Sequence, residues 1–578
     1  MVLLTSGRGS RLYPSRGRET SPAPGAWRLP PPPRRSISAG RLRRRLWVSL
    51  GQNVSSMAVR RISLGFLAFA LALTAPCWAR PGDDAVRSPV SAKSGEASSG
   101  DKDEWHKVFL AGQLAGHMHV SERRLENGGF SSTLTQKLVL KRDTTVLETE
   151  ATSTVEEDRN GRIVGFTVRQ RLSSQASEVV GKLEGKEFAL SEDDGSPSPG
   201  GPAKPGEKKP LRLSRMPADS EAVGPHRMDA LLQAKLHKPG DSLELKIFIP
   251  ELRKFGIQKS VLEVEEIVDL GGSKPKLRRV RSTIDALPDI PTIQWVDADG
   301  NLQKSSLPLL GTELTTVRTT MAEVLKSSLT SPPEIFLSTS VPVKGKVNAE
   351  ARQITFRITG KKDAAPFQGS RKIFPAAGEE EVRPGTASER WLRVRRVAAP
   401  EGIKLPIAPQ PELDEYLRPS AYVQSDDETI QRAAKKAIAG ETDAVAAALK
   451  LESWVHSTIE RKNLSTAFAS AAEALAQREG DCTEHAVLLA ALLRAVGIPS
   501  RVVAGLVHYD GVFYGHMWTE AYLGTWIPLD ATQAKGSVGP DHIALSVSSL
   551  DSATVAGVFL DIVPVIGNVT IEVVESGG

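Results

Sequence analysis

Cysteine is nearly absent from this chain, whose 578 residues include only Cys77 and Cys482. A fold held together by several disulfides is therefore excluded. Cys77 falls in a segment that we expect to be removed, so Cys482 is the one thiol expected in the processed protein. A lone cysteine in an exported protein is either a reactive thiol or a small buried hydrophobe. The count favours neither, and the sequence around Cys482 has to decide.

Aromatic residues and long apolar runs are also scarce. Aromatics make up 5% of the chain, whereas glycine (48) and proline (38) are plentiful, which indicates loops and linkers. The apolar run within residues 57–79 is too short for a permanent transmembrane span, and no other stretch is a candidate. With 40% hydrophobic and 25% charged residues, the composition is globular, and the length allows two or three domains.

The net charge of +6 is unevenly distributed. Residues 1–56 contain eleven arginines and one glutamate, and Arg60 and Arg61 add two positive charges. The remainder, residues 80–578, therefore carries a net charge of −6. A mildly acidic folded region gives no support for binding to nucleic acid.

Residues 57–79 have the pattern of a secretory signal peptide. Met57 precedes the basic pair Arg60 and Arg61, an apolar stretch follows, and Ala79 supplies a small residue at the cleavage position. The pattern predicts an exported protein in the periplasm or the cell envelope. Lipoprotein anchoring through Cys77 is a less favoured alternative, because Pro76 stands where such signals prefer a small residue.

Two interpretations of residues 1–56 stay open. In one, the start of the chain is assigned too early and this arginine-rich segment is not translated. In the other, it is a basic, disordered leader that precedes the signal peptide.

The rest of the chain divides by composition into four parts. Residues 80–103 are expected to form a disordered linker rich in Ser, Gly and Pro. Alternating apolar runs with Asn–Gly and Asp–Gly turns predict an antiparallel β domain over 104–335. Residues 336–415 are expected to be a β-rich connector, and 416–578 a catalytic domain with several helices.

Two helices are expected at the start of this last part. Ser425 and Glu428 form a capping-box pattern that predicts a helix from Ser425 to about Gly440. The next helix carries one apolar face, and its His456 is most simply a surface or packing residue. On the β domain, His117 and His119 share one strand face, but two histidines with no third ligand predict no metal site.

A buried helix is expected to begin at Cys482. The segment from Cys482 to Val496 is apolar on nearly all sides, Gly480 precedes it, and Gly497 and Pro499 end it. The unpaired N–H groups and partial positive charge of a helix N-terminus stabilise a thiolate. We therefore expect the pKa of Cys482 to lie below the usual value of about 8.5 and Cys482 to be a nucleophile.

A thiol nucleophile requires a base, and three histidines are candidates. His485 lies on the same helix as Cys482, where rigid spacing favours a supporting role, and His508 lies on the strand before a turn expected at Asp510–Gly511. His516 lies on the next strand, and Asp530 ends the strand after that. Asp530 could orient the imidazole of His516 across the sheet, as in other triads.

Three segments in order, "GDCTEHAVLLAALLRAVGIPSRVVAG", "GHMWTEAYL" and "WIPLDAT", resemble the transglutaminase-like superfamily. The resemblance implies an α+β fold with a papain-like thiol core at the C-terminus, preceded here by the mostly antiparallel β domain. It also implies Cys482 as nucleophile, His516 as base and Asp530 as its partner, with no metal and no organic cofactor. His485, Trp518 and Glu520 are expected to support the site, Glu520 by pairing with Arg501 or His485.

The chemistry that follows is acyl transfer at amide bonds through a Cys482 thioester, with a protein or peptide as substrate. Hydrolysis is slightly favoured over transamidation, which would cross-link proteins. A non-catalytic binding or scaffold module of the envelope is the alternative from another class. A calcium-dependent enzyme has no support, because no clustered acidic loop is present. The sequence carries no signal for the oligomeric state.

Overall fold

The computed structural model describes most of the chain after residue 101. The described residues are 102–142, 145–171, 176–193, 211–309, 311–327, 332–333, 340–361, 367, 376–461, 468–536, 538–550 and 562–577. The expected leader, the signal peptide and most of the linker lie outside them. Within the described residues, no helix is long and apolar enough to cross a membrane.

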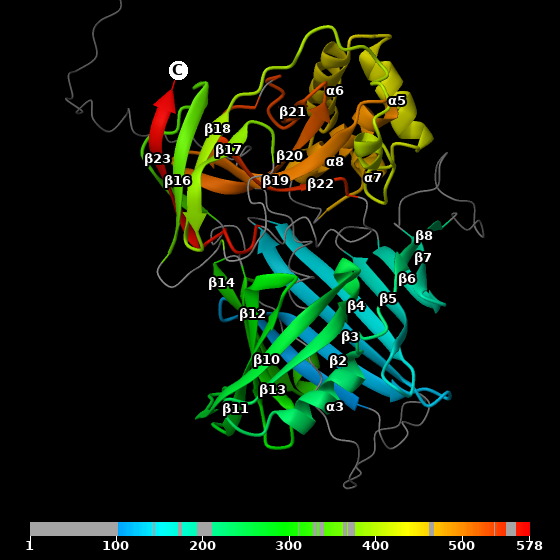
Figure 1. Ribbon diagram of the computed structural model, residues 1–578, viewed down its shortest axis with the longest axis vertical. Helices are drawn as coiled ribbons and strands as arrows, with labels where there is room; N and C mark the ends of the chain where they lie inside the picture. Colours follow the sequence, from blue (N-terminus) through cyan, green and yellow to red (C-terminus); the bar gives the residue numbers. More distant parts are fainter. Residues whose placement is uncertain are drawn as a thin grey trace, which may run out of the picture. The chain divides into compact units, whose positions relative to one another are not determined.

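The N-terminal part of the described chain is one antiparallel sheet in which strands that are neighbours in sequence pair with each other, except that β8 and β9 lie at its two edges (Figure 1). The order is β8-β7-β6-β5-β4-β3-β2-β1-β14-β13-β12-β11-β10-β9. The pairing of β1 with β14 joins the strands β1 to β8 to the strands β9 to β14. The strands are β1 (Lys102–Leu110), β2 (Gln113–Arg124), β3 (Phe130–Arg142), β4 (Thr145–Glu157), β5 (Ile163–Arg171), β6 (Ala176–Glu184), β7 (Glu187–Asp193), β8 (Arg212–Pro217), β9 (Ser242–Ile249), β10 (Lys254–Ile267), β11 (Lys276–Ile284), β12 (Leu287–Val296), β13 (Leu302–Leu309) and β14 (Thr312–Thr319).

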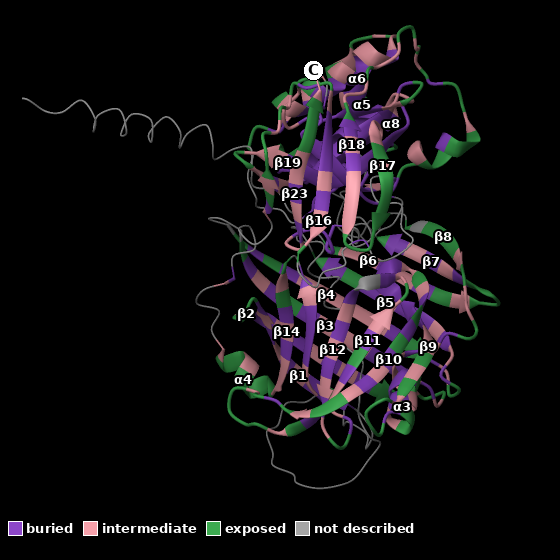
Figure 2. Cartoon of the chain, turned by 60° about the vertical axis from the view of Figure 1, so that its left-hand side comes forward, coloured by how far each residue is buried: buried purple, intermediate pink, exposed green. Residues whose placement is uncertain are grey.

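This sheet is curved, and its strands have one buried face. Buried residues alternate with more exposed ones along β1 and β2, visible in Figure 2 as purple bands across the strands. Val223 forms isolated bridges with both Arg162 and Ile247, which ties the start of β5 to β9. The expected antiparallel pairing is thus confirmed, but β1 already begins at Lys102, two residues inside the expected linker.

Short helices complete this part of the chain. They are α3 (Pro225–Lys235) and the 3₁₀ turn η1 (Pro250–Leu252), which follow β8 and β9, and α4 (Met321–Lys326), which follows β14. Thr320 caps α4 by accepting a hydrogen bond from the Glu323 N–H.

The C-terminal part has a second sheet of order β17-β18-β16-β23-β15-β20-β19-β22, with β21 paired to β20. Its strands are β15 (Val341–Lys344), β16 (Gln353–Gly360), β17 (Glu379–Thr386), β18 (Glu389–Arg395), β19 (Ser500–Tyr509), β20 (Val512–Tyr522), β21 (Trp526–Leu529), β22 (His542–Ser548) and β23 (Val569–Gly577). The last strand, β23, pairs with both β15 and β16. The expected connector over 336–415 therefore contributes strands to this second sheet, and the boundary at 415 does not separate two sheets.

Four helices accompany this sheet: α5 (Glu428–Ile438), α6 (Ala444–Thr458), α7 (Ala471–Gln477) and α8 (Cys482–Ala495). The 3₁₀ turn η3 (Pro411–Tyr416) precedes them. The predicted cap of α5 is wrong: Asp427, not Ser425, accepts hydrogen bonds from the N–H groups of Thr429 and Ile430. The described chain as a whole is mostly β, with its helices concentrated in this part (Figure 1).

Candidate active site

Cys482 is the first residue of α8, as the sequence predicts. Asp481 caps the helix: its Oδ1 accepts from the Thr483 N–H at 2.9 Å, while the Glu484 carboxyl accepts from the Asp481 N–H at 2.8 Å. Burial, together with repulsion from Asp481, raises the pKa of Glu484 to about 8. The thiol is 1% exposed, so it lies at a fixed helix terminus within the core.

The strand that carries His516 packs against this helix. Thr519 on β20 donates a side-chain hydrogen bond to the Ala486 carbonyl of α8 at 2.9 Å. At the other end of the helix, Arg494 donates to the Ser500 carbonyl, where β19 begins, at 2.8 Å. Helix and sheet are therefore joined at both ends, and Cys482 and His516 lie on adjoining elements.

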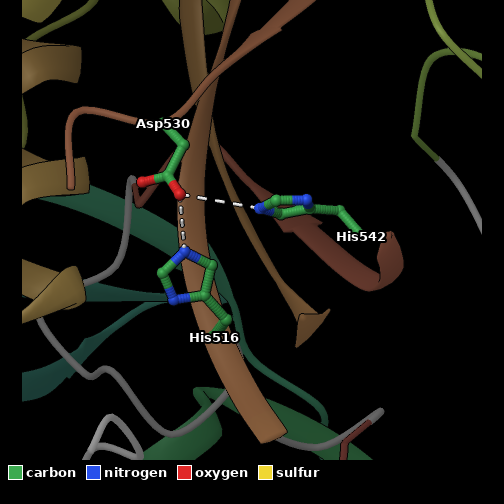
Figure 3. A group of neighbouring side chains, drawn as sticks. All are labelled: His516, Asp530 and His542. Atoms are coloured by element: carbon green, nitrogen blue, oxygen red, sulfur yellow. Dashed lines mark hydrogen bonds and ion pairs between the residues drawn. The ribbon is translucent and has the colours of Figure 1, made fainter. Parts of the chain in front are cut away.

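His516 and Asp530 form the buried pair that the sequence predicts. The His516 Nε2–H donates to Asp530 Oδ2 at 3.0 Å, and both side chains are almost fully buried. The pairing of β20 with β21 brings the two residues together, because Leu529 lies opposite Thr519 and Asp530 directly follows β21. Figure 3 shows the second ring nitrogen of His516 turned away from Asp530. The carboxylate thus fixes the ring and its tautomer and leaves Nδ1 to face elsewhere.

Asp530 is held as an anion by its surroundings. Burial alone would raise its pKa, but the charge of His516, the hydrogen bond from His516 and the nearby His542 outweigh it and keep the pKa well below the ordinary value. Its Oδ1 accepts from the N–H and the hydroxyl of Thr532, at 2.9 and 2.7 Å, and Oδ2 accepts from Gln533 at 3.0 Å. The carboxylate is therefore oriented on both of its oxygens.

Glu452 on α6 holds the backbone on which Asp530 sits, and sequence reasoning missed it. Its carboxyl accepts from the Asp530 N–H and the Gly536 N–H, both at 3.0 Å. Burial and repulsion from Asp530 raise the pKa of Glu452 to about 7. The apolar pattern of α6 gave no direct sign of this role, since Glu452 is a single buried carboxyl among apolar residues.

A second histidine, His542 at the start of β22, also reaches Asp530 and was not predicted. Its Nε2 lies 3.6 Å from Asp530 Oδ2 (Figure 3), and its Nδ1 donates to Asp541 Oδ1 at 3.0 Å. Burial opposes its charge, but the nearby Asp530 carboxylate and the hydrogen bond to Asp541 raise the pKa of His542 to about 9. At neutral pH His542 is therefore an imidazolium beside Asp530.

One family model matches the part of the chain that carries most of these residues. Residues 431–531 match the model of the transglutaminase-like superfamily, a segment that includes Cys482, His516 and Asp530. This segment is a transglutaminase-like domain. The match covers the site but not the N-terminal sheet, on which it has no bearing.

Other similar proteins add little to this domain assignment. An uncharacterized protein of Mycobacterium leprae (strain TN) is 28% identical over 162 residues, which is 26% of this chain and 54% of that protein. The chain thus spans about half the length of that relative. Among solved structures, a candidate cysteine protease from Cytophaga hutchinsonii has 20% identity and a TM-score of 0.25, covering 42% of this chain and 85% of the other. A β-barrel-like protein of unknown function from Brucella abortus has 11% identity and a TM-score of 0.27, covering 38% and 95%.

The predicted supporting residues of the transglutaminase-like domain take separate positions. Glu520 pairs with Arg501, as one of the two expected alternatives, through Nη2 at 2.6 Å and Nε at 2.7 Å. Trp518 stacks on His516 with ring centroids 6.1 Å apart. His485 Nδ1 hydrogen-bonds to the carbonyl of Asp481 at 2.6 Å, one turn back on α8.

His508 is not part of the His516 cluster. It packs edge-on against Phe513 on the neighbouring strand, and burial lowers its pKa. On the N-terminal sheet, His119 bonds to Asp103 at 2.6 Å and stacks on Trp105, so its contacts are structural. Of the three histidines that the sequence offers as a base, His516 is the one that is hydrogen-bonded to Asp530.

Among the residues that the structure describes, one group of side chains could hold a metal ion, although the sequence predicts none. The ligand atoms of His516, Asp530 and His542 all lie within 4.8 Å of one another. Nitrogen and oxygen donors of this kind suit a divalent transition metal. The same atoms are engaged in the His516–Asp530–His542 contacts, and those contacts are sufficient to explain the arrangement.

Replacing His542 by Gln is expected to reduce stability in a pH-dependent manner. Its folded pKa of about 9 exceeds the ordinary 6.5, so its contribution is fully present below pH 6.5 and is lost as pH rises through about 9. A rise of this size corresponds to about 3 kcal/mol. The free energy of unfolding of His542→Gln, from urea titrations at pH 6 and pH 9.5, should fall well below wild type at pH 6 only.

His508→Gln is the matched control, because His508 lies in the same sheet but has a lowered pKa. A group buried as the neutral form destabilises the fold on protonation, so this variant should lose no stability specific to pH 6. Equal losses for His542→Gln at both pH values would show that His542 contributes packing rather than charge.

Proposed function

We propose that the chain is a thiol-dependent enzyme that transfers acyl groups from amide bonds. The Cys482 thiolate attacks the amide carbonyl, and His516 gives its proton to the departing ammonia or amine. A thioester joins the substrate acyl group to Sγ. Water, deprotonated by His516, attacks this thioester and releases the acid and the free thiol. The Cys482 backbone N–H, at the α8 terminus, is a suitable donor to the oxyanion.

The observation that carries the proposal is the buried hydrogen bond between His516 Nε2 and Asp530 Oδ2 at 3.0 Å. It supports a base with a fixed tautomer on the strand packed against α8, the helix that begins with Cys482. An anion kept ionised beside that base would stabilise the imidazolium formed during catalysis. A module that only binds a partner does not need such a pair, which makes the scaffold alternative less favoured.

For the second half of the reaction we propose hydrolysis in the cell envelope, on peptide substrates. The expected signal peptide supports export. An amine that competes with water would instead give a transamidated product, the alternative outcome. Neither the charge of the site nor the helix position of Cys482 distinguishes the two acceptors, so the test has to include both.

The thiol chemistry can be tested by alkylation of the full chain with iodoacetamide between pH 5 and pH 10. Mass spectrometry locates the adduct on Cys482 and separates it from Cys77. We expect the rate at Cys482 to follow a pKa clearly below about 8.5, because of the helix N-terminus and His516. The pH midpoint is the informative quantity, since burial of the thiol slows the rate at every pH.

His516→Ala and Cys482→Ala are the variants that complete this test. The first should move the midpoint upward, and the second should abolish labelling at this position. A midpoint at or above about 8.5 in the wild type would contradict an activated thiol. A glutamine-containing peptide, incubated with and without cadaverine, then separates cleavage or deamidation from amine incorporation by the product masses.

A further inference from the structure

The curved N-terminal sheet encloses a cavity that has no part in the proposed reaction. Its volume is about 130 Å³. Strands β3, β4, β9, β10, β11 and β12 contribute to its wall, and Glu251 of η1 lies at one side. Apolar side chains that include Val120, Val155, Phe248 and Ile290 form much of the surface. The wall is built from residues that are far apart in sequence but paired in one sheet.

A buried glutamine faces this cavity with its hydrogen-bonding capacity unused. Gln294, on β12 between Val280 and Ser305, is 1% exposed and lines the cavity. Neither the nitrogen nor the oxygen of its side-chain amide has a hydrogen-bond partner among the described residues. Burying an unpaired amide is costly, by about 1–3 kcal/mol, so such a group in a folded interior points to a partner that fills the space.

The electrostatics of the wall favour an uncharged partner. Glu251 is the one ionisable side chain among the described residues that line the cavity, and it is 5% exposed. Burial raises the pKa of Glu251, with opposing hydrogen bonds from its own backbone and Ser153. An anion would meet this carboxyl and an apolar wall with no cation to pair with, which is unfavourable. A neutral chain with one polar end matches the surface instead.

We propose that this cavity binds an uncharged amphiphile, a short alkyl chain that ends in a carboxamide paired with the side-chain amide of Gln294. The N–H of each carboxamide donates to the C=O of the other, so both unused atoms of Gln294 acquire partners. The alkyl chain lies against Val120, Val155 and Ile290. A cavity of about 150 Å³ holds benzene, so a cavity of about 130 Å³ has room for a small organic molecule.

Hexanamide, with a six-carbon chain and one carboxamide, is the probe for this site. Calorimetric titration of the full chain is done in a Cys482→Ala background, so that reaction of an amide with the thiol contributes nothing. We expect saturable binding of hexanamide and at least tenfold weaker binding of hexanoate and hexylamine. Tighter binding of hexylamine would assign the cavity to cations at Glu251 and overturn the proposal, as would an absence of hexanamide binding.

Gln294→Leu keeps the volume of the side chain and removes both polar atoms. It should weaken hexanamide binding by about tenfold, the effect of one or two lost hydrogen bonds. Gln113→Leu, the same change at an exposed position of β2, should leave the affinity unaltered. Equal affinity of Gln294→Leu and Gln113→Leu would show that the Gln294 amide is satisfied by water and does not hold the probe.

Filling the cavity is an independent check. Val120→Phe adds an aromatic ring to the wall and should abolish binding of hexanamide while thermal unfolding stays cooperative. Unchanged binding to a folded Val120→Phe protein would place the probe elsewhere and overturn the assignment. If this variant does not fold, the comparison of Gln294→Leu with Gln113→Leu decides by itself. Loss of activity at Cys482 has no influence on any of these titrations, so the two proposals can fail separately.

Discussion

Asp530→Asn is expected to lower kcat for cleavage of the glutamine-containing peptide by about 10,000-fold, with the fold preserved. The amide is nearly the same size as the carboxyl and can still accept from the Thr532 N–H, as Asp530 does at 2.9 Å. It carries no charge, however, and its NH₂ group can donate to His516 and favour the wrong tautomer. The imidazolium that forms during acyl transfer would then lose its stabilising anion.

The measurement is single-turnover kinetics on the peptide, accompanied by the pH profile of Cys482 alkylation. Asp541→Asn is the matched control, because Asp541 is hydrogen-bonded to His542 at 3.0 Å, whereas Asp530 is hydrogen-bonded to His516 itself. It should reduce the rate far less. A kcat for Asp530→Asn within tenfold of wild type would remove Asp530 from the proposed triad, whatever happens to the control.

The position of Cys482 could be predicted because all its determinants are local. Gly480 has φ of +147°, and a side chain there would meet Glu484 Cβ at 2.5 Å. Asp481 supplies the cap, and Gly497, with φ of +82°, ends the helix region as expected. These signals lie within a few residues of the helix they delimit, so the predicted helix is confirmed to within one residue.

The surroundings of Asp530 could not be predicted, because they come from separate elements. Glu452 lies on α6 and His542 on β22, 78 and 12 residues away in sequence, and each makes contact only after the sheet has formed. Nothing in the local sequence of Glu452 distinguishes it from a surface carboxyl. The adjacent pair Asp541 and His542 is the one available sign, because neighbouring acidic and imidazole groups often share a hydrogen bond.

The strands of the expected connector illustrate a similar limit. Their alternating pattern predicts β structure, which β16 and β18 confirm. The pattern does not say which sheet a strand joins, since that depends on β23, more than 200 residues later, pairing with β16. The capping signal before α5 was ambiguous for another reason: Ser425, Asp426 and Asp427 are all good caps, and the structure uses the last.

Arg501→Met is expected to destabilise the C-terminal part of the chain by about 3–5 kcal/mol. It leaves the Glu520 carboxylate, which is fully buried, without its cation. Glu520 also accepts from the Ala377 N–H at 2.9 Å, so it cannot move toward solvent without breaking that bond. Arg501 in addition lies over the Trp526 ring at 4.2 Å, and Met retains part of that apolar contact.

Unfolding of this part can be followed through Cys482 itself, because the thiol is buried in the folded state. Pulses of a thiol reagent across a urea titration report the fraction of exposed Cys482, which mass spectrometry distinguishes from Cys77. The double variant Arg501→Met/Glu520→Gln should lose less than Arg501→Met alone, because no buried charge remains and the amide oxygen of Gln can still accept from Ala377.

Arg461→Met provides the control for the substitution as such. Arg461 pairs with Glu479 at 2.8 Å, and the two residues are about as far apart in sequence as Arg501 and Glu520. The side chain of Arg461, however, is 66% exposed. Water solvates both partners when the pair is broken, so the loss should stay below about 1 kcal/mol. Comparable losses for Arg461→Met and Arg501→Met would mean that burial of Glu520 adds nothing. If the double variant loses as much free energy of unfolding as Arg501→Met or more, the interaction within the pair, and not the unpaired buried charge of Glu520, accounts for the stability.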